Sequence, residues 1–144
     1  MDNKAAGPDG RTTRAEPQSF RARELGASLT VRDLDASVKW YQEVLGFLVE
    51  KRHERGGKVM AVSLKAGRVE ILLTQDDGAK GMDRRKGEGI SLQFTTMQSV
   101  DSIAGRVRAC GVALATEPTD TPWGARVFRV VDPDGFRLVI SSAT

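Results

Sequence analysis

The stretch ASLTVRDLDASVKWYQEVLG (27–46) decides the fold of this chain. Its first five residues alternate apolar and polar side chains, which is typical of a strand with one buried face. Asp33 can cap a helix, apolar residues then recur at helical spacing as far as Leu45, and Gly46 is suited to end the helix. The stretch therefore predicts a strand followed directly by an amphipathic helix.

The rest of the chain extends this unit and then repeats it. After the helix we expect strands near 47–53, 58–65 and 68–74, and a Gly- and charge-rich loop at 75–88. The second half predicts a strand at 89–96, a helix from Val100 that Gly111 ends, and strands near 112–116, 126–131 and 136–142. Gly46 and Gly111 lie 65 positions apart, as do Leu29 and Phe94. This common register indicates an internal duplication of a βαβββ unit.

Length and composition are those of an ordinary globular domain. The chain has 144 residues, 40% apolar and 28% charged, which excludes wholesale disorder. No apolar run is long enough to cross a bilayer, and no signal peptide is recognisable. We expect a flexible arm at 1–24 and one domain at 25–144, with modules at about 25–76 and 89–144.

Cysteine and charge bear on location and partners. Cys110, the only cysteine, excludes an intrachain disulfide and fits a cytoplasmic protein. It falls on the apolar face of the second predicted helix, so we expect a buried structural thiol. The 22 basic and 19 acidic residues are well mixed, with no basic stripe that carries aromatic residues. Neither a nucleic acid nor a membrane is therefore an expected partner.

Strand alternation predicts which side chains face a ligand. If Leu29 and Val31 pack on the first helix, then Gly26, Ser28 and Thr30 face away from it. In the second half, Ser91, Gln93 and Thr95 face away by the same argument, as do Arg137, Val139 and Ser141 on the last strand. Two curved sheets with such open faces can enclose a ligand cleft.

At this point the sequence resembles the vicinal oxygen chelate superfamily, which includes glyoxalase I, extradiol dioxygenases and bleomycin-resistance proteins. The residues that carry the resemblance are LTVRDLDASVKWYQEVLGF (29–47), ISLQFTTMQSVDSIAGRVRACGV (90–112) and WGARVFRVVDPDGFRLVI (123–140). The resemblance implies an α+β fold of two βαβββ modules that form a curved sheet cleft, commonly completed in a homodimer. The fold hosts several chemistries, so function has to be argued from the site.

The resemblance also implies where a divalent metal would be held, by histidines that open each module's first strand and by carboxylates on later strands. The histidine positions fall on Gly26 and Ser91, and the last carboxylate position falls on Val139. Glycine and valine offer no ligand atom and a serine hydroxyl is a poor one, whereas a selective site needs three or four ligands. We therefore expect no metal and no other cofactor.

Two residues could restore some chemistry. Glu70 lies near the first module's carboxylate strand, although Leu72 could occupy the matching place instead. Glu70 is the one weak catalytic candidate, because it could act as a general base if it were buried. His53, the only histidine, is expected in an exposed charged turn.

We therefore favour a metal-independent protein that binds a small molecule, of the metal-free bleomycin-resistance-like branch, with ligand or antibiotic sequestration as one form of that function. The alternative is a glyoxalase- or dioxygenase-like lyase or isomerase that uses Glu70 or a divergent metal site. The expected partners are the small-molecule ligand and a second copy in a homodimer. The candidate ligand-binding residues are Ser28, Met60, Glu70, Ser91, Gln93, Trp123, Arg126, Arg137 and Val139.

The charge of the candidate residues bears on the ligand. Bleomycin-type drugs are cationic, and a cleft that captured them would benefit from a negative potential. Arg52, Arg126 and Arg137 instead favour an anionic or neutral ligand.

Overall fold

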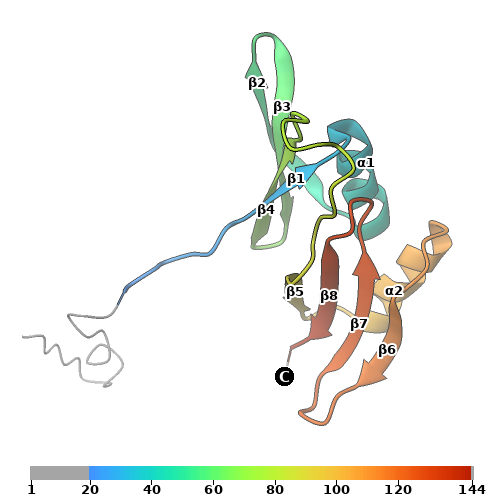
Figure 1. Cartoon of the computed structure of the whole chain (residues 1–144). Helices are drawn as coiled ribbons and strands as arrows, with labels where there is room; N and C mark the ends of the chain where they lie inside the picture. Colours follow the sequence, from blue (N-terminus) through green and yellow to red (C-terminus); the bar gives the residue numbers. More distant parts are fainter. Residues whose placement is uncertain (1–19, 144) are drawn as a thin grey trace, which may run out of the picture.

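A computed structural model describes residues 20–143 and places two βαβββ modules in the chain (Figure 1). The first contains β1 (Ala27–Val31), α1 (Leu34–Leu45), β2 (Leu48–Arg55), β3 (Lys58–Ala66) and β4 (Val69–Gln75). The second contains β5 (Ser91–Thr96), α2 (Val100–Ala109), β6 (Thr116–Asp120), β7 (Arg126–Val131) and β8 (Arg137–Ser142). The predicted α+β fold is confirmed.

Local sequence signals set the ends of α1. The Asp33 carboxylate accepts a hydrogen bond from the Ala36 amide, which satisfies one of the free donors of the first turn. Gly46 follows the last turn with φ 78°, a left-handed conformation that glycine adopts without steric cost. Gly111 takes the same conformation after α2, with φ 81°. Both helices are thus followed by a left-handed glycine, which is the C-cap itself in α1 and the residue after the C-cap Cys110 in α2.

Each module forms its own four-stranded sheet, and the two sheets share one topology. The strand order is β1-β4-β3-β2 in the first, hereafter the N-terminal sheet, and β5-β8-β7-β6 in the second, the C-terminal sheet. The first strand of each module pairs in parallel with the last, and the other pairs are antiparallel. One helix covers one face of each sheet (Figure 1). The other face, here called the open face, has no helix over it.

The apolar core lies between the sheets and their helices and is continuous across both modules. Leu29, Val31, Leu138 and Ile140 belong to it, as the predicted alternation requires. Phe47 and Phe94 meet edge to face across the module boundary, with ring centroids 5.9 Å apart. The two modules therefore fold against each other rather than as separate bodies.

The last β7–β8 turn fastens the second module to the first. Tyr41 of α1 donates a 2.6 Å hydrogen bond to Asp132, and Asp134 accepts hydrogen bonds from the Arg32 amide at 2.8 Å and from Ser37 at 3.3 Å. Burial raises the pKa of the Asp132 carboxyl, while the bonds from Tyr41 and from two backbone amides of the turn act against that rise. The Asp-Pro-Asp-Gly sequence thus supplies both a turn and two buried acceptors for the other module.

The linker between β4 and β5 is fixed at the same junction. Asp76 accepts a 2.6 Å hydrogen bond from the buried Lys86 ammonium, and this bond lowers the pKa of Asp76. Gly87 then passes so close to the β7–β8 turn that a Cβ atom there would lie 2.4 Å from the Gly135 carbonyl oxygen. Only glycine fits this contact without moving backbone.

One strand is displaced from its predicted position. The apolar alternation at 112–116 predicts a strand there, but β6 begins at Thr116. Val112 and Leu114 pack against the core from the loop that follows α2, so their periodicity reflects burial rather than strand pairing. The actual strand contains Pro118, which an edge strand tolerates because it needs fewer ladder donors.

The expectation of a buried Cys110 is wrong. The side chain is exposed at the C-terminal end of α2, and its sulfur lies 3.4 Å from the Glu43 carbonyl oxygen. The helix ends one residue earlier than its apolar periodicity suggests, so Cys110 lies past the last residue of the buried stripe.

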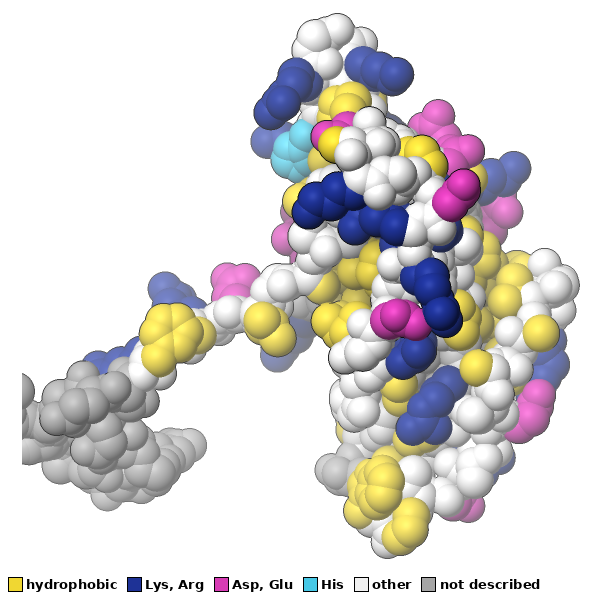
Figure 2. All heavy atoms as spheres, in the orientation of Figure 1, with side chains coloured by type: hydrophobic (Ala, Val, Ile, Leu, Met, Phe, Trp, Pro, Cys, Tyr) yellow, Lys and Arg dark blue, Asp and Glu magenta, His cyan; other side chains and the backbone are white. Residues whose placement is uncertain are grey.

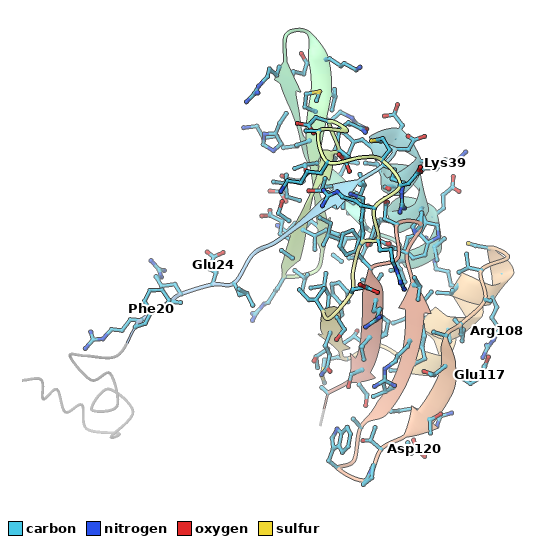
Figure 3. The ribbon with its side chains drawn as sticks, in the orientation of Figure 1. Phe20, Glu24, Lys39, Arg108, Glu117 and Asp120 are labelled. Carbon is cyan, nitrogen blue, oxygen red and sulfur yellow. The ribbon has the colours of Figure 1, made fainter. Side chains whose placement is uncertain are left out.

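Most of the expected arm at 1–24 lies outside the described residues. Within the described part, residues 20–26 run away from the sheets without regular structure, and Phe20 and Glu24 lie on this segment (Figure 3). Among residues 20–143 there is no helix with the length and apolar character needed to cross a membrane.

Candidate functional site

The open face of the N-terminal sheet carries a pocket of about 630 Å³. It lies over the paired strands β1 and β4 and reaches Ser63 on β3. Ser28 and Glu70, two of the predicted ligand-binding residues, are in its lining, together with Gly26 and Leu72. The first module therefore contributes one candidate half-site, with two hydroxyl groups, the carboxylates of Glu24 and Glu70, the Arg68 guanidinium and an apolar floor.

The open face of the C-terminal sheet carries a second pocket, of about 380 Å³. Ser91, Arg137 and Val139, all predicted from strand alternation, line it together with Arg129. Ser91 pairs with Arg137 across β5 and β8, and Gln93 pairs with Val139 on the same face. The second module therefore contributes another half-site, with two guanidinium groups.

The single chain does not bring these two half-sites together. The two pockets lie on different sheets and share no lining residue. The N-terminal and C-terminal sheets follow one another along the molecule, with both helices on one side (Figure 1). Ser28 and Glu70 are therefore grouped in one pocket, and Ser91 and Arg137 in another.

The strand register decides between Glu70 and Leu72. Ser28 and Gln93 are equivalent positions of the duplication, and they pair with Leu72 and Val139 respectively. Leu72 thus takes in the first module the place that Val139 takes in the second. Because successive residues on one strand face are about 7 Å apart, Glu70 lies one step away and is equivalent to Arg137.

The residues at the family's metal positions do not fit a metal. The family resemblance places three of these positions at Gly26, Ser91 and Val139, and the register places the fourth at Leu72. Of the four residues, only serine has a side-chain oxygen. Glu70 is exposed, and the other acidic residue in its pocket is Glu24, on the segment before β1. No histidine lines this pocket. Within residues 20–143, no three His, Cys, Asp or Glu side chains cluster as a metal site requires.

Four predicted ligand residues are absent from both pocket linings. Gln93 is the nearest of them, since it pairs with Val139, which lines the second pocket. Arg126 points to the helix side of its sheet, where it forms ion pairs with Asp101 and Asp120 at 3.0 Å. Met60 is half-buried on β3 and is absent from both pocket linings. Trp123 is 72% exposed in the turn between β6 and β7.

Two polar residues of the open faces, Arg129 and His53, were not predicted there from the sequence. Arg129 lines the C-terminal pocket because it alternates with the core residues Phe128 and Val130, a signal that was available in the sequence. His53 is half-buried within β2 rather than exposed in a turn, and its Nε2 atom lies 3.1 Å from the Ser63 hydroxyl. That contact could not be foreseen, since it depends on the β2–β3 register and its bulge.

Basic side chains gather on the face of the molecule that Figure 2 shows. Figure 2 shows Lys and Arg side chains gathered along the middle of the face turned to the viewer, from the linker down to the second module. Arg32 and Lys86 are part of the module junction, where carboxylates neutralise them.

Comparisons with known proteins agree with this architecture. The family described as the Glyoxalase/Bleomycin resistance protein/Dioxygenase superfamily matches residues 25–140. A search of curated proteins finds no match. A superfamily member from Sphaerobacter thermophilus is 20% identical, with a TM-score of 0.71 over 85% of this chain and 98% of that one.

Two other solved structures are similar over nearly their whole length. TioX from Micromonospora sp. ML1 is 23% identical, with a TM-score of 0.66 over 85% of this chain and 97% of that one. A protein from the mobile metagenome of V. pseudocholerae is 25% identical, with a TM-score of 0.67 over 88% and 98%. Because the family match spans both modules and the topology agrees with it, the chain belongs to the glyoxalase/bleomycin resistance protein/dioxygenase superfamily.

Proposed function

We propose that the protein binds a small molecule without a metal, in a cleft that two copies of the chain build together. One observation carries the proposal: each sheet presents an open face with its own pocket, and the single chain leaves the two pockets apart. A second copy that covers the N-terminal open face with its C-terminal open face would close two equivalent clefts. Such a C2 arrangement uses the same pair of surfaces twice.

The donor chemistry of the open faces supports binding without a metal. The family's metal positions carry glycine, leucine, serine and valine. The polar groups around them are hydroxyl, carboxylate and guanidinium groups on the N-terminal sheet, and hydroxyl, amide and guanidinium groups on the C-terminal sheet. These groups recognise a ligand by hydrogen bonds over an apolar floor, which is the usual composition of a small-molecule site. The protein would thus resemble the metal-free, sequestering branch of its family.

Light scattering and a thermal-shift ligand screen test this proposal together. We expect the mass of a dimer, and a rise in melting temperature with a planar or oxygenated small molecule that binds only the native state. A monomeric mass at every concentration would contradict the shared cleft. Elemental analysis adds an independent check: stoichiometric Ni, Zn, Fe or Mn that survives dialysis and is lost in Glu70→Gln would overturn the metal-free proposal.

Catalysis by Glu70 is the second candidate. Glu70 and Ser28 both line the N-terminal pocket, which is where a base would have to meet a ligand. Its side chain is exposed in the single chain, so the burial that a general base needs would have to come from the second copy. Turnover of a screened ligand by the wild type and its loss in Glu70→Gln would favour the enzyme over the binding protein.

A further inference from the structure

We infer that the C-terminal open face is an anion-binding subsite, in which Arg129 and Arg137 hold a carboxylate or phosphoryl group above Val139. This inference rests on the proposed binding function and adds the chemical class of the ligand: a small molecule with one oxyanion attached to an apolar body. Arg129 pairs with Val139 across β7 and β8, and Arg137 lies two residues before Val139 on β8. The two arginines are therefore diagonal neighbours on one face, within reach of a common ligand.

No acidic side chain of the C-terminal sheet is available to neutralise these arginines. Glu117 and Asp120 on β6 face the helix side, where they pair with Arg108 of α2 and with Arg126 (Figure 3). Asp132 and Asp134 are buried at the module junction. In the part of the chain that the structure describes, neither Arg129 nor Arg137 makes an ion pair or a side-chain hydrogen bond.

The neighbouring groups extend the set of donors. Ser91 is the cross-strand neighbour of Arg137, and Gln93 is the cross-strand neighbour of Val139, both with exposed side chains on the same face. A guanidinium offers two parallel N–H donors to an oxyanion, and a hydroxyl or amide can bind a further oxygen. Two like charges side by side also repel each other, so an anion between them relieves that repulsion. The C-terminal open face thus presents many hydrogen-bond donors and two positive charges. No carboxylate of the C-terminal sheet lies on this face to neutralise them.

The floor of the pocket selects an apolar body. Val139 lines the pocket and packs with Ala125 and Val127 in a small apolar cluster that is separate from the main core. A ligand whose oxyanion meets Arg129 and Arg137 would place its adjoining carbon atoms on this cluster. The charge and the floor together favour an amphipathic acid over a cationic drug.

Heteronuclear NMR tests the subsite directly on the full-length protein. Sodium benzoate and inorganic phosphate are titrated against sodium chloride of equal ionic strength, and the side-chain Nε–Hε signals of Arg129 and Arg137 are followed. We expect both signals to shift in a saturable way with benzoate or phosphate. The Arg126 signal should not move, because its Nε–H already bonds Asp101. Equal shifts with chloride, or equal shifts of Arg126, would overturn the inference.

Variants assign the effect to the two arginines. Arg129→Gln/Arg137→Gln should weaken benzoate binding at least tenfold, and each single variant should give a smaller loss. Arg55→Gln, at the end of β2, removes the same charge from the other sheet and should change the affinity less than twofold. Unchanged affinity in the double variant, or an equal loss in Arg55→Gln, would contradict the assignment.

Benzamide separates this inference from the proposed function, because it keeps the ring and removes the charge. If benzamide binds as tightly as benzoate, the anion subsite is refuted while small-molecule binding stands. If benzoate binds through the two arginines but the thermal-shift screen and light scattering give neither a ligand nor a dimer, the subsite stands and the shared cleft does not. A response to phosphate but not to benzoate would assign the site to phosphoryl ligands, and the reverse to carboxylates.

Discussion

Gly87 gives the sharpest test of how the two modules are joined. Gly87 and Gly89 both have left-handed backbone, with φ 78° and 75°, and they lie two residues apart in the same linker. A Cβ on Gly87 would lie 2.4 Å from the Gly135 oxygen and 2.8 Å from the Phe136 Cα, whereas a Cβ on Gly89 meets nothing within 4 Å. Replacing each by alanine therefore compares the same conformational strain with and without a collision.

The expected costs follow from this difference. An alanine in left-handed backbone costs roughly 1–2 kcal/mol, which applies to both Gly87→Ala and Gly89→Ala. The collision involves backbone atoms on both sides, so the linker must move off the β7–β8 turn, and overpacking of this kind costs about 1–3 kcal/mol more. We thus expect the free energy of unfolding of Gly87→Ala to lie about 1–3 kcal/mol below that of Gly89→Ala. For a chain of this size that corresponds to a difference in Tm of about 3–10 °C.

Urea unfolding followed by far-UV circular dichroism measures both variants beside the wild type. The m-values should agree, so that the midpoints report stability rather than a changed denatured state. If the two variants agree within about 0.5 kcal/mol, the linker does not press on the turn as the structure indicates. The module junction would then not depend on the close contact between Gly87 and the β7–β8 turn.

Three further predictions concern the same junction. Tyr41→Phe removes the bond to Asp132 but keeps the aromatic packing, so it should cost about 2 kcal/mol in urea unfolding; a cost below about 0.5 kcal/mol would show that the bond is not formed. The folded state raises the pKa of the Asp132 carboxyl. The stability that this carboxyl contributes is therefore fully present below 3.8, its pKa in the unfolded chain, and is lost as pH rises through its pKa in the folded protein. The stability of Asp132→Asn relative to the wild type should therefore increase from pH 4 to pH 7. A constant difference between their urea midpoints over this range would contradict the raised pKa. Lys86 lowers the pKa of the Asp76 carboxyl, so the stability that this carboxyl contributes is present above 3.8 and is lost as pH falls through its lower pKa in the folded protein. Lys86→Met should therefore lower the Tm more at pH 7 than at pH 3. An equal loss of Tm at both pH values would be inconsistent with the Lys86–Asp76 pair.

Most of the fold could be predicted from the sequence because its elements carry strong local signals. The strands at 27–31 and 126–131 begin and end where their alternation predicts, and Gly46 and Gly111 mark the helix ends. The strand predicted at 112–116 was misplaced because Val112 and Leu114 are buried as loop residues, and alternation reports burial rather than pairing.

The candidate site could be predicted only in part. Alternation places Ser28, Ser91 and Arg137 on the open faces, because facing depends on residue spacing within one strand. The choice between Glu70 and Leu72 depends on how β4 pairs with β1, a register that a single strand does not encode. The separation of the two pockets likewise depends on packing between modules, which no local pattern specifies.

The junction between the modules has a consequence for the history of the duplication. Tyr41 bonds the β7–β8 turn, but the equivalent residue of α2 is Arg106, which instead donates to the Glu43 and Gln42 carbonyl oxygens at the end of α1. The turn that would correspond to Asp132–Gly135 is the β3–β4 turn around Gly67, which carries no carboxylate. Two copies of one half could not form the Tyr41–Asp132 bond, since the hydroxyl donor belongs to one half and its acceptor to the other. The two halves are therefore complementary rather than interchangeable, and we expect that neither half by itself forms this junction.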